Sequence, residues 1–405
     1  MVNAKSFLFL ATLSLLSFRV AAQQNADSIH SAPAVSLHYN GQISGWMQYA
    51  PDISSNFWLG GRYIPQLNLN IPLKNNHLKQ SSEPPAGGRL IDFEFSANIL
   101  GDMGVHLGNQ AAFDWRIKPY RAWARYSAER VEVRLGLQKI NFGSAALFRP
   151  LMWFDQLDPR DPLQLTDGVW GLLGRYYFQN NTNIWLWGLW GNNRRKGWEM
   201  LSTARHIPET GGRIQFPVPR GETALSYHFR KVDPLLPGSS ATEEENPALS
   251  ENRWGFDTRL DVTVGLWLEA SWTRIDKSLG MFANQEMITL GADYTWGIGN
   301  GLMTTFEQLV FSYDRTAFRF ANSISFSGLS LSYPVGLFDH LNAITYYDWT
   351  NRNAYFFLNW QKSFDHLTFY LMGYWNPKNY SLPGQSMAGE RFAGKGLQFM
   401  AVWNY

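Results

Sequence analysis

The chain has 405 residues, a formal charge of +2 at neutral pH, 16% aromatic residues and no cysteine. A charge this close to zero argues against a nucleic-acid-binding protein, and the lack of cysteine excludes disulfides and thiolate metal sites. The eight histidines form no pair at a zinc-binding spacing, so we expect neither a metal nor a cofactor.

The N-terminus has the features of a secretory signal peptide. Lys5 precedes the apolar run 7–18 (FLFLATLSLLSF), and Val20-Ala21-Ala22 suits a cleavage site before Gln23. This run is too short for a membrane-spanning helix, and no later apolar run reaches about 18 residues, so a helical membrane protein is excluded. We expect cleavage after Ala22 and a short polar segment over 23–38; a buried N-terminal helix is the alternative.

From residue 39 onward, apolar and polar residues alternate. In the segment 89–99, for example, Phe93 and Phe95 alternate with Asp92 and Glu94. A period of two gives a strand with one apolar and one polar face. Segments of about 10 residues suit tilted strands that cross a membrane.

The segment 113–140 predicts a hairpin with an irregular first strand. Apolar side chains occupy odd positions before Lys118-Pro119 and even positions after it. This switch indicates a β-bulge at Pro119, which has no N–H to donate to a neighbouring strand. A short turn at 128–130 leads into the second strand.

The same pattern predicts eighteen strands, with sixteen as the alternative count. They are expected at 39–49, 59–71, 89–99, 113–128, 131–140, 168–178, 183–190, 212–218, 222–230, 253–263, 265–273, 286–296, 301–313, 319–333, 340–349, 353–361, 367–375 and 395–405. Connections alternate between short and long, except that 72–88 is long on the side of the short turns. We therefore predict a single all-β domain over 39–405, an antiparallel transmembrane β-barrel of 16–18 strands in the outer membrane of a Gram-negative-type bacterium.

The last strand, 394–405, ends the chain on an aromatic residue. Trp403 and Tyr405 share its apolar face with Leu397 and Phe399. This ending resembles the terminal signal that the barrel assembly machinery recognises in outer-membrane proteins. Besides membrane lipid, that machinery is therefore an expected partner.

A short motif resembles a known group of barrels. Arg134, Gly136, Gln138, 141–143 (NFG) and 167–168 (DG) match a pattern of outer-membrane porin-like barrels, notably the alginate-export and phosphate-selective groups, around 120–177. The resemblance implies a β-barrel channel. Leu137 stands where that pattern has arginine, so a pore arginine is not implied there.

The long connection 141–167 is the candidate constriction loop. Its charged and aromatic candidates are Arg149, Trp153, Asp155, Asp158, Arg160 and Asp161. Such a loop can fold into the lumen and narrow it, with aromatic residues on the wall and charges toward the channel. The alternative is an external loop stiffened by its prolines.

Charges on the polar strand faces are unevenly distributed. The pore-lining candidates are Arg116, Arg121, Arg125, Arg134, Asp92, Glu94, Asp257 and Asp261. Basic residues prevail over 113–140 and acidic ones, including Glu269, over 253–296, which would set up a transverse field across the lumen. The alternative is pairing within the lumen, for instance of Arg125 with Asp92.

Two other groups of residues were weighed. The aromatic residues Trp185, Trp187, Trp190, Trp198, Tyr346, Tyr347 and Trp349 are expected in interfacial girdles, with sugar stacking as the alternative. Ser226 and His228 share a strand face, but no third residue evidently orients the histidine, so no enzyme is predicted.

These features predict a passive porin-like or export channel, selective by charge and size, for small polar or anionic solutes or a polysaccharide. The alternative is a non-conducting barrel that anchors or plugs a larger envelope complex.

Overall fold

The computed structural model describes residues 35–52, 56–73, 88–105, 112–234, 247–378 and 392–405. Residues 35–405 form one compact unit. The expected signal peptide, most of the segment 23–38 and most of the connection 72–88 lie outside the described residues. The first strand begins at Ser36, three residues earlier than the alternation predicts.

The described residues of this unit form eighteen strands. They are β1 (Ser36–Tyr49), β2 (Phe57–Leu73), β3 (Arg89–Val105), β4 (Ala112–Ser127), β5 (Val131–Gln138), β6 (Val169–Tyr177), β7 (Asn183–Leu189), β8 (Glu209–Val218), β9 (Gly221–Val232), β10 (Leu249–Asp261), β11 (Gly265–Arg274), β12 (Asn284–Trp296), β13 (Leu302–Asp314), β14 (Ser323–Pro334), β15 (Asp339–Asp348), β16 (Asn353–Ser363), β17 (Leu367–Trp375) and β18 (Lys395–Asn404). A short 3₁₀ helix, η2 (Lys277–Phe282), lies between β11 and β12.

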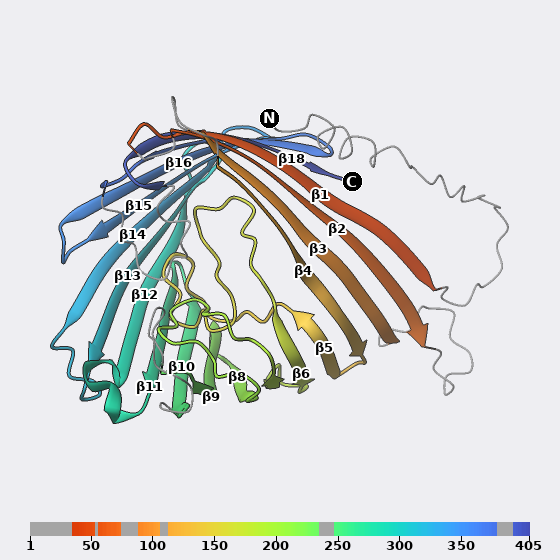
Figure 1. The fold of residues 1–405 in the computed structure, drawn as a ribbon, viewed down its shortest axis with the longest axis vertical. Coiled ribbons are helices and arrows are strands. Elements are labelled where there is room, and N and C mark those ends of the chain that lie inside the picture. The colour runs from red at the N-terminus through yellow and green to blue at the C-terminus, as the bar shows by residue number, and fades with distance from the viewer. Residues whose placement is uncertain (1–34, 53–55, 74–87, 106–111, 235–246, 379–391) are drawn as a thin grey trace. The chain divides into compact units, whose positions relative to one another are not determined.

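The strands form a closed ring. Each pairs antiparallel with its neighbours in sequence, and β1 also pairs with β18, where Gln42 lies opposite Asn404 (Figure 1). The prediction of an all-β antiparallel barrel is therefore confirmed, with the larger of the two expected strand counts. Closure leaves no strand edge without a partner, as a barrel in lipid requires.

The strand pairing contains the expected irregularity in β4. Ser96 pairs with Arg121 and Ala97 with Pro119, so Tyr120 is the extra residue. The β-bulge predicted beside Pro119 is thus present. It returns Arg121 to the face that Lys118 occupies before the bulge, so the basic side chains of β4 all point into the barrel.

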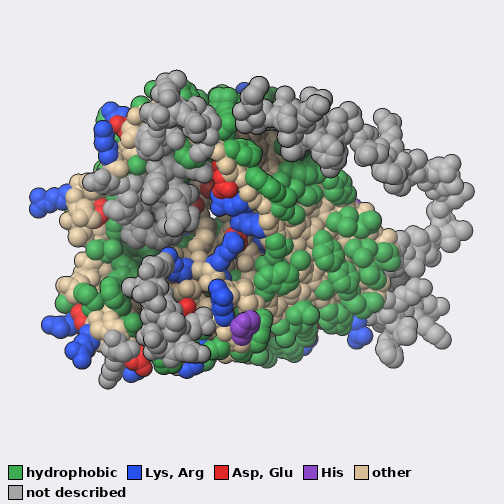
Figure 2. All heavy atoms as spheres, viewed as in Figure 1, with side chains coloured by type: hydrophobic (Ala, Val, Ile, Leu, Met, Phe, Trp, Pro, Cys, Tyr) green, Lys and Arg blue, Asp and Glu red, His purple; other side chains and the backbone are tan. Residues whose placement is uncertain are grey.

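The outer face of the barrel is apolar. Large side chains that are half exposed or more occur all round it, among them Leu135, Leu186, Leu225, Leu290 and Leu358. Figure 2 shows such side chains gathered over the outer surface, in green at the right of the view. A continuous apolar band on a closed barrel is typical of a surface solvated by lipid. In the part of the chain that the structure describes, no helix is long and apolar enough to span a bilayer.

Several aromatic residues expected at the membrane interface lie inside the barrel instead. Trp187 is 4% exposed and Tyr346 is 1% exposed, because both project from the inner strand face. Trp198 packs 5.7 Å from the ring of Phe311 on β13. The girdle interpretation is therefore wrong for these residues, whereas Trp349 is exposed and lies 4.7 Å from the ring of Tyr347.

Candidate functional site

The segment 139–168 between β5 and β6 folds into the barrel. Figure 1 shows it in yellow inside the ring of strands. The turn of this segment is held by Glu307 on β13. The Glu307 carboxylate accepts hydrogen bonds from the backbone N–H groups of Ala146 (2.6 Å), Leu147 (3.0 Å) and Phe148 (2.6 Å). The same carboxylate accepts a 3.0 Å bond from the indole N–H of Trp267. A buried carboxylate with several N–H donors is a strong attachment point.

A second carboxylate, Glu269 on β11, fixes the two sides of this turn. It accepts the backbone N–H groups of Ala145 at 2.9 Å and Leu151 at 2.6 Å. Gly143 has a φ of +100°, and a Cβ there would lie 2.4 Å from a Glu269 oxygen. Only glycine suits both the positive φ and the short distance to Glu269. The close approach of the loop backbone to the Glu269 carboxylate therefore requires glycine at position 143.

Aromatic side chains pack the loop against the wall. The Trp153 indole N–H donates to Ser271 Oγ on β11 at 3.1 Å, and its ring meets Phe142 edge-on at 5.6 Å. Opposite this cluster the wall is indented at Gly255 on β10, where a Cβ would lie 2.5 Å from Leu151. The loop therefore fits a recess in the wall as well as bonding to it.

The charged candidates of this loop bond mainly within the loop itself. Arg149 bonds to Asp155 at 3.2 Å, and Asp158 bonds to Arg160 at 2.6 Å. Asp161 accepts the backbone N–H of Leu163 at 3.0 Å. Burial raises the pKa of both Asp155 and Asp161 above the usual range of a carboxyl. The charges thus help to shape the loop.

The loop reaches across to the strands that close the barrel. Leu163 packs against a cluster of Tyr370, Met400 and Val402 on β17 and β18. Arg160 lies 5.2 Å from the ring centre of Phe357 on β16. Because the other attachments are on β11 and β13, the segment spans much of the lumen.

The basic candidates on β4 and β5 have acidic partners. Arg125 bonds to Asp92 on β3 at 2.7 Å. Glu132 lies 3.3 Å from Arg134 and 3.2 Å from Arg175. The alternative of pairing within the lumen is therefore observed for Arg125 and Asp92.

The remaining arginine candidates, Arg121 and Arg116, differ in their exposure and in their bonding partners. Arg121 is 8% exposed and donates to the carbonyl oxygens of Tyr120 and Thr166, which ties β4 to the inward loop. Arg116 is exposed and lies 3.1 Å from Asp114. Glu94 lies opposite Trp123 in the register between β3 and β4.

The acidic candidates on β10 are paired too. Asp257 bonds to Arg213 on β8 at 2.5 Å, and both side chains are almost fully buried. Asp261 lies 3.1 Å from Arg259, which also bonds to Asp293 at 2.9 Å. Asp257, Asp261 and Asp293 are thus each paired with an arginine, of which Arg213 was missed from the sequence.

Solvent reaches some charged residues inside the barrel and not others. Glu269 and Glu307 are fully buried under the loop. Across the lumen, the side chains of Lys118 and Asp167, joined at 2.5 Å, keep 35% and 52% exposure. Figure 2 shows basic and acidic side chains along the middle of the view. The loop thus buries Glu269 and Glu307 on β11 and β13, whereas Lys118 on β4 and Asp167 at the end of the loop stay in contact with solvent.

Several tryptophan rings on the inner wall lie under guanidinium groups. Arg134 lies 4.7 Å from the ring centre of Trp123, and Arg175 lies 3.8 Å from that of Trp185. A ring covered in this way has lost one stacking face. The sugar-stacking alternative therefore gains no support at Trp185.

His228 belongs to a buried network rather than to a pair with Ser226. Its Nδ1 accepts the indole N–H of Trp187 at 3.1 Å, and its Nε2 lies 3.2 Å from Glu209. Ser226 Oγ accepts a 3.1 Å bond from Arg213 instead. The sequence did not reveal Glu209 as a partner, because the contact joins residues on different strands.

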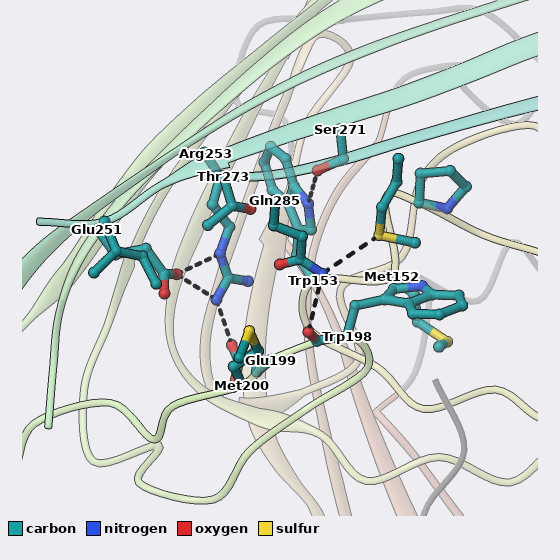
Figure 3. A pocket seen from close by; sticks show the side chains of 13 residues that line it. Met152, Trp153, Trp198, Glu199, Met200, Glu251, Arg253, Ser271, Thr273 and Gln285 are labelled. Carbon is teal, nitrogen blue, oxygen red and sulfur yellow. Dashed lines mark hydrogen bonds and ion pairs between the residues drawn. The ribbon is translucent and has the colours of Figure 1, made fainter. Parts of the chain in front are cut away.

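A small cavity lies between the inward loop and β10–β12 (Figure 3). Its volume of about 20 Å³ suits roughly one water molecule rather than a solute of metabolite size. Among the described residues, no group of three or more His, Asp or Glu side chains could hold a metal ion.

The candidate assembly residues lie at the seam of the barrel. Trp403 is 45% exposed on the outer face of β18. The backbone of Tyr405 exchanges two 3.1 Å hydrogen bonds with Gly41, and its hydroxyl lies 2.8 Å from that of Tyr63. A Cβ at Gly41 would lie 2.6 Å from the Tyr405 hydroxyl oxygen, so a larger residue there would displace the ring.

No protein-family model matches the chain, and no curated protein matches it in sequence. Solved structures match it in fold. Acinetobacter baumannii OccAB1 is 8% identical with a TM-score of 0.52, and the match covers 92% of this chain and 96% of OccAB1. Pseudomonas aeruginosa OpdQ is 9% identical with a TM-score of 0.50, over 92% and 99% of the two chains. The anion-selective porin from Comamonas acidovorans is 12% identical with a TM-score of 0.45, over 92% and 100%. The chain thus has the fold of the porin-like outer-membrane β-barrels.

Proposed function

We propose that this protein is a passive channel for small polar solutes in the outer membrane of a Gram-negative-type bacterium. The observation that carries the proposal is the position of the segment 139–168. It is pinned to Glu269 and Glu307 on β11 and β13, while Lys118 on β4 and Asp167 at the C-terminal end of the segment keep contact with solvent. A loop held in this way narrows a lumen without needing to fill it.

The charges that face inward from β2–β6 favour anionic solutes over cationic ones. The basic residues that face inward from β2–β6 are Arg62, Arg116, Lys118, Arg121, Arg125, Arg134 and Arg175; the acidic ones are Asp92, Glu94, Asp102, Asp114 and Glu132. Seven basic against five acidic residues leave an excess of two positive charges on these strands. Because most are paired, we expect a weak preference that salt reduces.

Planar-bilayer recording of the purified protein tests this function. We expect discrete conductance steps, and a reversal potential in a KCl gradient that favours chloride more at low than at high ionic strength. Liposome swelling with sugars of increasing size would give the size limit. A folded barrel that never conducts would contradict the channel and favour the anchoring alternative.

A further inference from the structure

One side of the lumen is lined by uncharged polar side chains. This surface extends over seven neighbouring strands, β14–β18, β1 and β2, at the end of the barrel where the short turns lie. Directly opposed pairs on its inner face include Asn342 and Asn359, Gln42 and Asn404, and Asn40 and Gln66. From Ser330 on β14 round to Asn70 on β2, the described inner-face residues at this end include two histidines but no Asp, Glu, Lys or Arg. We call this surface the amide wall.

The amides of this wall face the lumen because their neighbours in sequence face outward. Asn40 follows Tyr39, and Asn359 lies between Leu358 and Trp360; these three neighbours are exposed on the outer face. Successive side chains of a strand point to opposite faces. The amides nevertheless keep part of their surface exposed, so solvent inside the barrel reaches them.

The amide wall begins where the inward loop meets β17 and β18. Leu163 of the loop packs against Tyr370 and Val402. Asn404 lies two residues beyond Val402 on the same face of β18, and Gln361 on β16 lies opposite Tyr370. A solute that passes the inward loop on this side therefore reaches the amide wall directly.

Hydrogen bonds within the wall orient several of its amides. Gln66 Nε2 donates to Asn68 Oδ1 at 3.1 Å, and Asn68 Nδ2 donates to Asn40 Oδ1 at 3.4 Å. Across the seam of the barrel, Gln42 Nε2 donates to Asn404 Oδ1 at 3.1 Å. An amide group has two N–H donors and a carbonyl oxygen with two lone pairs, so each of these side chains can still bind a further partner.

Two acceptor atoms of the wall have no hydrogen bond to the protein. Gln42 Oε1 and Asn359 Oδ1 are buried atoms, and neither bonds to any of the residues that the structure describes. A buried acceptor of this kind costs free energy unless a donor reaches it. A hydroxyl group of a solute can supply that donor.

The charged residues at the same end of the barrel lie on other strands. They include the pair of Arg125 and Asp92 on β4 and β3, and the pair of Arg259 and Asp293 on β10 and β12. A phosphate or carboxylate group offers only acceptor atoms, so the carbonyl oxygens of the amide wall repel it. A hydroxyl group both donates and accepts, as an amide does. The wall therefore matches a solute with many hydroxyl groups and no charge.

We propose that the amide wall binds a neutral polyhydroxylated solute, an oligosaccharide, on its way through the channel. The inference rests on the proposed channel function and names a substrate class for it. Hydroxyl groups of the solute replace the water that solvates the amides, and the oxygens of Gln42 and Asn359 accept two of them. Binding is weak, because each hydrogen bond to the solute replaces one to water, and weak binding permits release.

Direct binding tests this proposal without conduction. Saturation-transfer NMR on the full barrel in lauryldimethylamine oxide micelles uses two neutral sugars as probes, maltohexaose and laminarihexaose. We expect saturation transfer to at least one of them. Polyethylene glycol of similar length is the control solute, because it has ether oxygens but hydroxyl groups only at its ends. We expect its signal to be several-fold weaker.

Two double variants test the wall on either side of the seam. They are Asn40→Leu/Asn68→Leu and Asn342→Leu/Asn359→Leu, in which leucine has nearly the size of asparagine but forms no hydrogen bond. We expect each to raise the dissociation constant of the sugar about five-fold. Asn183→Leu is the matched control, because Asn183 is an inner-face amide at the same end of the barrel but on β7, outside the wall. Unchanged heat-modifiable migration on gels confirms that each variant folds.

Single-channel recording gives a second readout. We expect the bound sugar to block part of the KCl current. The sugar concentration for half-maximal block should rise in both double variants by the same factor as the dissociation constant, and should stay unchanged in Asn183→Leu.

The outcomes separate the binding site from the channel. Weaker sugar binding in either double variant, with Asn183→Leu unchanged, supports the amide wall. Equal binding in all variants, an equal loss in Asn183→Leu, or no binding of either sugar by wild type overturns it. Tighter binding of an anionic oligogalacturonate than of the neutral sugars overturns the substrate class. Sugar binding by a barrel that never conducts overturns the channel function but supports the amide wall as a binding site.

Discussion

The carboxylate of Glu307 on β13 accepts a 2.6 Å hydrogen bond from the backbone N–H of Phe148, more than 150 residues earlier in the chain. The preceding N–H groups of Ala146 and Leu147 converge on the same carboxylate. Three consecutive donors on one side chain fix both the depth and the direction of the turn. Glu307 thus helps to determine how far the inward loop enters the lumen, together with Glu269.

Replacing that carboxylate should loosen the loop. Glu307→Gln presents an amide N–H₂ toward backbone N–H groups that need acceptors, so at least one buried donor loses its partner. We expect the free energy of unfolding to fall by on the order of 3 kcal/mol and the open-channel current to become noisier. Denaturant titration in detergent and single-channel recording measure the two effects. A variant as stable and quiet as wild type would contradict this role.

The pair of Arg125 and Asp92 should contribute to stability more than to selectivity. Arg125→Gln leaves Asp92, which is 5% exposed, without its guanidinium. We expect a loss of about 1–3 kcal/mol, most of it recovered in the double variant Arg125→Gln/Asp92→Asn. Thermal unfolding of the two single variants and the double variant measures the coupling. Additive losses would show that the two side chains act independently.

Selectivity should respond to three arginines that face inward from β4 and β5 when they are replaced together. Replacing Arg121, Arg125 and Arg134 by Gln removes three positive charges from the lumen. We expect the reversal potential to shift toward cations, most clearly at low salt, because screening acts over about 8–10 Å at moderate ionic strength. Recording in KCl gradients at two salt concentrations checks this. A lower thermal midpoint with no shift in reversal potential would assign these residues to stability alone.

The seam of the barrel should depend on Tyr405 through its backbone and its ring. Tyr405→Phe retains the two backbone bonds to Gly41 and loses only the hydroxyl contact with Tyr63. We expect it to reach the outer membrane almost normally, Tyr405→Ala less so, and a chain lacking 396–405 hardly at all. Immunoblots of membrane and periplasmic fractions measure the levels. Normal abundance after the deletion would mean that another strand pairs with β1.

The alternation of apolar and polar residues was sufficient to predict the strands. In β3, for example, Phe95 is 53% exposed while Asp92 is buried, as the pattern requires. Strand faces follow from local geometry, because successive side chains point to opposite sides whatever the rest of the chain does. The bulge beside Pro119 was predictable for the same reason, since one extra residue reverses the parity.

What the sequence determined by itself was therefore the class of fold, the number of strands within two, and the inner face of strands with clear alternation, such as β3. Only the tertiary structure decided that 139–168 lies inside the barrel, that Glu269 and Glu307 hold it, and that Trp187 is buried. These features depend on contacts between residues distant in sequence: Phe148 meets Glu307, and Trp187 meets His228. Alternation with a period of two shows on which face of a strand each side chain lies. It does not show which backbone N–H groups, distant in sequence, a carboxylate on that face will bind.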